Sequence, residues 1–133
     1  MPTNNINVTL DTSTGTNRLS VTDNGGQNQV SQNPNPTTIN WHLTGSLTTA
    51  NFLPMDQYPP GFEWVNPTSA DVFGPPGIQG NGNIMSITDN HSSSSTNGQW
   101  IYMLRVNYNG SVITTTASVG IGGTVNNPII VNH

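Results

Sequence analysis

Residues 99–119 read QWIYMLRVNYNGSVITTTASV, two runs of strand-forming residues on either side of Asn109-Gly110. This dipeptide is the one that best tolerates the two positive φ angles of a two-residue type I′ turn, so the stretch predicts a β-hairpin. A turn at this position places five cross-strand pairs on one face of the hairpin. They are Tyr108 with Ser111, Val106 with Ile113, Leu104 with Thr115, Tyr102 with Ala117, and Trp100 with Val119.

The face that carries Trp100 and Tyr102 is the predicted core face of this hairpin. If the pairing slipped by one residue, both large side chains would face the solvent. Their burial therefore sets the register of the hairpin. The opposite face also holds apolar residues, namely Ile101, Met103 and Val112. If no second sheet covers them, they form an exposed apolar patch, and such patches mark contact sites.

The composition fits one small folded domain covering residues 1–133. Hydrophobic residues make up 32% of the chain, so the core has to depend on its few large aromatic side chains. Each of these contributes about 1.5–3 kcal/mol when it is buried. The main candidates for the core are Trp41, Phe52, Phe62, Trp64, Phe73, Trp100 and Tyr102.

The charge content excludes several kinds of partner. The chain has a formal net charge of −4, and its two basic residues are Arg18 and Arg105. A surface that follows a phosphate backbone cannot be built from two arginines, so we expect no nucleic-acid partner. No apolar run approaches the roughly 20 residues that span a bilayer, so we expect no membrane insertion. Without cysteine there is neither a disulfide nor a thiolate site.

Short strands separated by Pro, Gly and Asn clusters continue through the rest of the chain. No window shows a helical period, and the polar segment Gln27–Pro36 is predicted to be a loop. The pattern predicts an all-β fold, a single immunoglobulin-like antiparallel β-sandwich with Greek-key connections. A small antiparallel β-barrel is the alternative. The further predicted strands are 5–10, 18–22, 38–43, 62–65, 84–88 and 128–132.

Several of these segments resemble a diffuse group of small bacterial β-sandwich proteins of immunoglobulin-like type, most of them uncharacterised. In that group the chain ends in an Asp-Pro-x-Ile-x-Asn strand, and here Asn127 stands where Asp is more usual. The resemblance covers about residues 38–132 and implies the fold, but it supplies no catalytic residues. The matching segments are Ile39–Leu43, Phe62–Trp64, Phe73–Pro76, Trp100–Leu104 and Asn127–Asn132.

Catalytic and metal chemistry have little support in the sequence. Asp89-Asn90-His91 precedes Ser92–Ser95, which supplies the residue types of a Ser-His-Asp triad, but neighbours in one loop rarely reach each other in the required way. His42, His91 and His133 share no metal-ligand spacing. We therefore expect no enzyme activity, no catalytic residues, and neither a metal nor a cofactor.

Carbohydrate is a possible ligand class, because a sugar site needs an aromatic ring together with amide or carboxylate groups. The segment containing Asp56, Tyr58 and Trp64 holds these residue types. The loop formed by Asp89, Asn90 and His91 could complete such a site at the end of a strand. The same aromatic residues are also what a core with so few aliphatic side chains requires.

The sequence thus predicts a non-catalytic structural or protein-interaction module that self-associates as a homo-oligomer, with a carbohydrate-binding module as the alternative. The terminal strand is rich in β-branched residues and could pair with another chain. The start of the chain lacks a basic segment followed by an apolar one, so a natural start at Met1 implies the cytoplasm, and an added Met1 would suit an extracellular protein. The predicted interface residues are Ile101, Met103, Val112, Ile129 and Val131.

Overall fold

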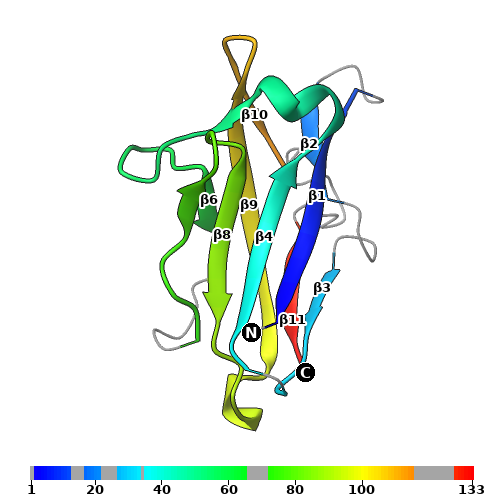
Figure 1. Ribbon diagram of the computed structural model, residues 1–133, viewed down its shortest axis with the longest axis vertical. Helices are drawn as coiled ribbons and strands as arrows, with labels where there is room; N and C mark the ends of the chain where they lie inside the picture. The colour runs from blue at the N-terminus through cyan, green and yellow to red at the C-terminus, as the bar shows by residue number, and fades with distance from the viewer. Residues whose placement is uncertain (1, 13–16, 22–26, 34, 66–71, 116–127) are drawn as a thin grey trace.

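Two β-sheets packed face to face make up the architecture (Figure 1). The computed structural model describes residues 2–12, 17–21, 27–33, 35–65, 72–115 and 128–133. The first sheet has the order β2-β1-β4-β8-β7 and comprises β1 (Thr3–Asp11), β2 (Arg18–Ser20), β4 (Thr37–Leu43), β7 (Gly77–Gln79) and β8 (Ile84–Asp89). The second contains β3 (Gln27–Val30), β5 (Asn51–Phe52), β6 (Phe62–Trp64), β9 (Gly98–Tyr108), β10 (Ser111–Thr114) and β11 (Ile129–Asn132).

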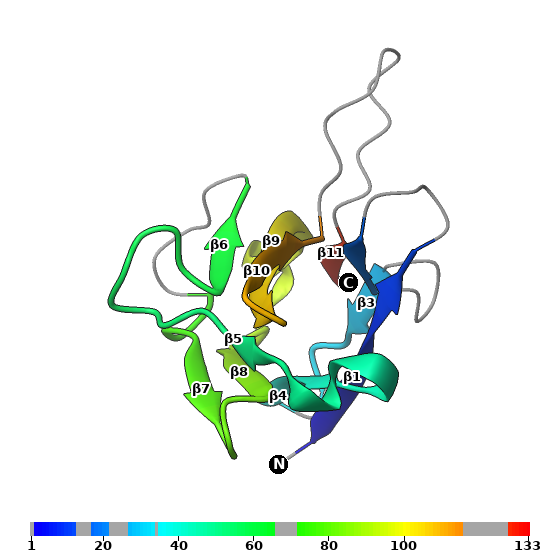
Figure 2. The same ribbon diagram turned by 90° about the horizontal axis from the view of Figure 1, so that it is seen from above.

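The long strand β9 organises the second sheet. One of its edges pairs with β10 and β11 and the other with β5 and β6, while β3 lies beyond β11. Two short 3₁₀ helices, η2 (Gly45–Thr49) and η3 (Ser94–Thr96), occupy connections between strands. Seen along the strands, the two sheets lie on opposite sides of the interior (Figure 2).

The predicted β-sandwich is confirmed, and the sheets do not close into a barrel. Both sheets are mixed rather than purely antiparallel, because β1 pairs with β4 and β3 pairs with β11 in the parallel sense. Parallel partners need a crossover connection, since the chain must return to the same end before the second strand starts. Between β1 and β4 that return includes β2 and β3, and between β3 and β11 it includes most of the chain.

The predicted hairpin register is correct next to the turn. Val106 pairs with Ile113, and the turn residues have φ angles of 52° at Asn109 and 80° at Gly110. Thr115 bonds the predicted partner Leu104: its backbone N–H donates to Leu104 O, and its hydroxyl accepts from the Leu104 N–H at 3.0 Å.

Farther along the same edge of β9 the predicted pairing is wrong. Trp100 pairs with Ile130 of β11, so the last strand takes the place next to Trp100 that the sequence assigned to Val119. The Tyr102 N–H likewise donates to Pro128 O, at 3.1 Å. Ala117 and Val119 lie outside the described residues.

The core follows the predicted face of β9. Tyr102, Leu104 and Val106 are completely buried, and Trp100 retains 9% of its exposure. The Trp41 indole N–H donates to the Tyr102 hydroxyl at 2.8 Å, so the buried indole donor is satisfied. Of the other predicted core residues, Phe52 and Phe62 are buried, and Trp64 and Phe73 are partly buried against the core.

The segment Gln27–Pro36 is a second correction, because its first part is a strand and not a loop. Gln27–Val30 pairs in parallel with β11, and Val30 is 2% exposed. Strand pairing uses backbone groups that every residue except proline carries, so a single apolar side chain is enough to anchor such a polar segment.

Candidate functional site

A buried polar network joins the two sheets at one end of the sandwich. Asp89 ends β8 in the first sheet and is inaccessible to solvent, and Asn132 ends β11 in the second sheet with 3% exposure. The Asn132 amide nitrogen Nδ2 donates to Asp89 Oδ1 at 3.0 Å and to Thr96 O at 3.1 Å. The Asn132 side chain therefore links β11 both to the opposite sheet and to the η3 segment.

His91 belongs to the same network and is also completely buried. Its Nε2 lies 2.8 Å from the main-chain O of His133, which accepts, so Nε2 carries a proton. Its Nδ1 lies 2.7 Å from Thr96 Oγ1, which in turn lies 2.7 Å from Ser93 O. Thr96 Oγ1 donates to Ser93 O, so His91 links the η3 segment to His133.

Two acceptor oxygens in this network have no hydrogen-bond partner among the described residues, Asp89 Oδ2 and Asn132 Oδ1. Burial raises the pKa of Asp89 from 3.8 to about 6, against the opposing effects of the Asn132 hydrogen bond and of His91. The carboxylate is thus held where its charged form is poorly solvated and incompletely bonded.

This geometry does not form a Ser-His-Asp triad. Both ring nitrogens of His91 are used by Thr96 and His133, and Asp89 is bonded by Asn132. Within the described part of the chain, no group of three or more His, Asp or Glu side chains could hold a metal ion. Asn90 is exposed, and its backbone N–H donates to Val72 O at 2.7 Å.

The other predicted ligand-binding residues lie in a different place. Asp56 and Tyr58 project from the loop between β5 and β6, where Tyr58 is 84% exposed. The Trp64 ring is packed edge-on against Phe62, with centroids 4.9 Å apart, and lies 4.7 Å from Phe73. Trp64 thus contacts Phe73, whose backbone forms a bridge with Asp89. No hydrogen bond or ring contact between described residues joins Asp56 or Tyr58 to the Asp89 network, so the ligand-binding role of this set stays a prediction.

An apolar row crosses the outer face of the second sheet. Ile129 pairs in register with Ile101, and on the other side of Ile101 the Val65 N–H donates to Ile101 O at 2.8 Å. Val65 is 48% exposed, and the others are half-buried. Met103 and Val131 extend the row on the same face, because alternate residues of a strand share a face. We call these five residues the outer patch.

Val112, also predicted to be an interface residue, lies on the same sheet but outside the outer patch. It is 57% exposed and pairs with Asn107, while the pair Thr114 and Arg105 lies between it and the outer patch. An ion pair therefore borders the patch on this side: Arg105 Nη2 donates to Glu63 Oε1 at 2.6 Å.

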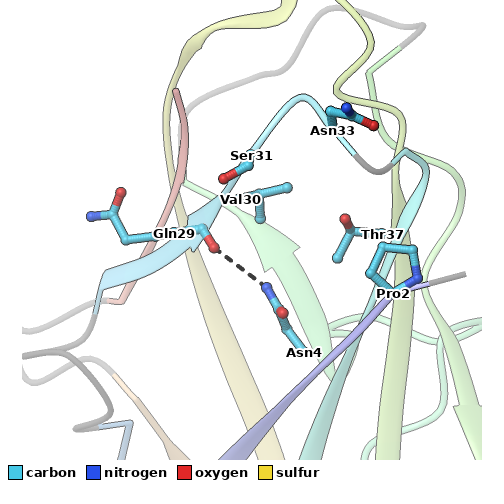
Figure 3. Close-up of a pocket in the computed structure, with 7 residues that line it drawn as sticks. All are labelled: Pro2, Asn4, Gln29, Val30, Ser31, Asn33 and Thr37. Carbon is cyan, nitrogen blue, oxygen red and sulfur yellow. Dashed lines mark hydrogen bonds between the residues drawn. The ribbon is translucent and has the colours of Figure 1, made fainter.

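A small hollow lies between β1 and β3 (Figure 3). Its volume is about 200 Å³, below the roughly 300–1,000 Å³ of common ligand pockets. The Asn4 amide nitrogen reaches across to Gln29 O at 3.4 Å. The lining offers amide, hydroxyl and apolar groups but no titratable side chain: Pro2, Asn4, Gln29, Val30, Ser31, Asn33 and Thr37.

Sequence reasoning missed Asn132, Thr96 and Val65 as members of these sites. For Asn132 a signal was present, because strand alternation places it on the same face as the buried Ile130, where a polar side chain needs a partner. Asp89 likewise shares the face of Ile87. For Thr96 and Val65 no local signal exists, since their roles depend on segments distant in the sequence.

The fold and these surfaces define the class of protein: an all-β sandwich of two mixed sheets, with a buried polar network at one end and an apolar patch on one outer face. No protein-family model matches the chain, and no curated protein is similar to it. Among the described residues, no helix is long and apolar enough to cross a bilayer.

Proposed function

We propose that this chain is a non-catalytic interaction module that associates with a second copy of itself through the outer patch. The observation that carries the proposal is the row Val65, Ile101 and Ile129 on the outer face of the second sheet. Ile129 of β11 pairs with Ile101 of β9, and Val65, the residue after β6, bonds Ile101 on the other side. Contiguous apolar surface of this kind costs free energy in water and is removed by association. The immunoglobulin-like assignment is part of the proposal, and it rests on the resemblance of residues 38–132 and on the two packed sheets.

A second copy is the favoured occupant because the border of the outer patch is electrostatically self-complementary. In a two-fold interface the same surface meets itself, so each charge must find its opposite on an identical face. Arg105 and Glu63 lie side by side at this border, with 12% and 34% of their side chains exposed. A two-fold axis through the apolar row can place Arg105 of one copy near Glu63 of the other.

The low charge of the chain also favours association with itself. A formal net charge of −4 spread over 133 residues produces little repulsion between identical molecules at physiological ionic strength. The outer patch needs no conformational change to become available, since its side chains already point out of the sheet.

Sedimentation equilibrium on the full chain and two matched variants tests the proposal. Wild type is expected to form dimers that dissociate on dilution. Val65→Asp places a charge in the outer patch and should give monomers, whereas Val112→Asp places the same charge on the same sheet outside the patch and should leave dimers. Circular dichroism of both variants checks that the fold is kept, which the exposure of both side chains favours.

Two results would overturn the proposal. One is a wild-type chain that stays monomeric at the highest attainable concentration. The other is a Val112→Asp variant that dissociates as completely as Val65→Asp, because association would then not depend on the outer patch.

A second candidate function is carbohydrate binding at the loop between β5 and β6. The supporting observation is the Tyr58 ring, 84% exposed and flanked by the exposed polar residues Asp56 and Gln57. An exposed ring next to polar side chains can stack on a sugar and bond its hydroxyls. Titration of a panel of oligosaccharides into wild type and Tyr58→Ala tests it; absence of binding to wild type eliminates it.

A further inference from the structure

We propose that Asp89 and Asn132 form a protonation-dependent link between the two sheets, which we call the latch. When Asp89 is protonated, its Oδ2–H donates a hydrogen bond to Asn132 Oδ1 and completes a reciprocal pair of hydrogen bonds. The proposal concerns the end of the sandwich, not the outer patch, and does not depend on self-association.

The geometry carries this inference because one half of the pair is already formed. Asn132 Nδ2 donates to Asp89 Oδ1 at 3.0 Å, which sets the amide beside the carboxyl group. The remaining oxygen of each group, Asp89 Oδ2 and Asn132 Oδ1, is buried and has no partner among the described residues. Two acceptors cannot bond each other, but one added proton turns the carboxylate into a donor and satisfies both.

The surroundings of Asp89 favour uptake of that proton. The residue is fully buried, and a buried carboxylate with an unpaired oxygen is costly in its charged form. The neighbouring β4 contributes Thr37 and the bridge on the other side contributes Phe73, neither of which is charged. The titratable side chain that faces Asp89 within the described residues is His91, whose cationic form would favour the carboxylate.

The latch ties together segments that the sheets alone do not connect. Asp89 ends β8 of the first sheet, and Asn132 ends β11 of the second and also bonds Thr96 O of η3. Closing the second hydrogen bond therefore holds the last strand and η3 to the opposite layer. Loss of the proton leaves two buried acceptor oxygens without a partner and weakens this end of the sandwich first.

Nuclear magnetic resonance titration of the labelled full chain tests the latch directly. The Asp89 side-chain carboxyl carbon and the Asn132 side-chain amide are expected to titrate with one shared midpoint near 6. Asp89→Asn, which is permanently neutral, should abolish the titration of the Asn132 amide. Asp56→Asn removes an exposed carboxylate in the β5–β6 loop and should leave the Asn132 titration unchanged.

An unfolding measurement gives a second, independent readout. Relative to Asp89→Asn, the unfolding equilibrium constant of wild type should fall about tenfold on going from about pH 7.5 to about pH 5, because the folded chain takes up the extra proton. Parallel profiles for wild type and Asp89→Asn would overturn the latch. An Asn132 amide that does not titrate together with Asp89 in wild type would also overturn the latch, as expected if a water molecule bridges the two oxygens. This titration uses the wild-type chain and does not depend on whether a variant folds.

Discussion

Tyr102→Phe removes one hydroxyl from the centre of the core and leaves every other contact of the ring in place. The Tyr102 hydroxyl accepts from the Trp41 indole N–H at 2.8 Å, and both side chains are completely buried. The Tyr102 ring stacks on Phe62, with an interplanar angle of 10° and centroids 5.3 Å apart, and this contact does not involve the hydroxyl. The substitution therefore tests the hydrogen bond that the Trp41 indole donates to this hydroxyl.

The expected loss of stability is about 2 kcal/mol, since a buried donor left without an acceptor costs about 1–3 kcal/mol. A domain of this size has a free energy of unfolding of roughly 7–20 kcal/mol, so the variant should still fold. Urea unfolding followed by tryptophan fluorescence measures the difference, and the slope against urea concentration should not change.

A double-mutant cycle separates the hydrogen bond from the packing. In a Trp41→Phe background the donor is absent, so the further change Tyr102→Phe should cost less than about 0.5 kcal/mol. Tyr58→Phe removes the same hydroxyl from a residue that is 84% exposed, and it should change stability by no more than about 0.5 kcal/mol. An equal cost of Tyr102→Phe in both backgrounds would show that the hydrogen bond is not the cause.

Three further predictions concern turns, close packing and pH. Gly61→Ala would bring a Cβ within 2.5 Å of Leu53 O, so we expect a loss of about 1–3 kcal/mol in urea unfolding, against little change for Gly77→Ala, where nothing lies within 4 Å. Gly110→Ala meets no atom but has a φ of 80°, and it should lower stability by about 1–2 kcal/mol through backbone strain alone, read as a lower Tm; an unchanged Tm would contradict this. Because burial raises the pKa of Asp89 in the folded chain to about 6, its contribution to stability is full below 3.8 and is lost as the pH rises through 6. The total is about 3 kcal/mol, and thermal unfolding in a series of buffers should show wild type more stable at about pH 5 than at about pH 7.5, whereas a flat profile would contradict the shift.

Much of the fold could be predicted from local pattern. Alternation with a period of two identifies which side chains of a strand share a face, and it correctly placed Trp100, Tyr102 and Leu104 in the core. The Asn109-Gly110 turn and the pairs beside it were likewise predictable, because a two-residue turn determines the register of the residues next to it.

The candidate sites could be predicted only in part. The sequence predicts Asp89 and His91 as parts of a loop that could bind a ligand, whereas in the structure both belong to a buried network. The sequence predicts Ile101 on the outer face of the hairpin and Ile129 in a terminal strand that could pair with another chain. Their position side by side follows from the pairing of β9 with β11, which joins segments far apart in the chain.

The sequence by itself determined an all-β chain, its main hairpin, the face of β9 that enters the core, and a surface with very few charges. These properties depend on residue type and on neighbours within a few positions. Only the tertiary structure decided the parallel pairing of β1 with β4 and of β3 with β11, and the meeting of Asp89 with Asn132. The physical reason is that strands pair through backbone groups common to nearly all residues, so the choice of partner depends on how the two sheets bury their apolar faces together.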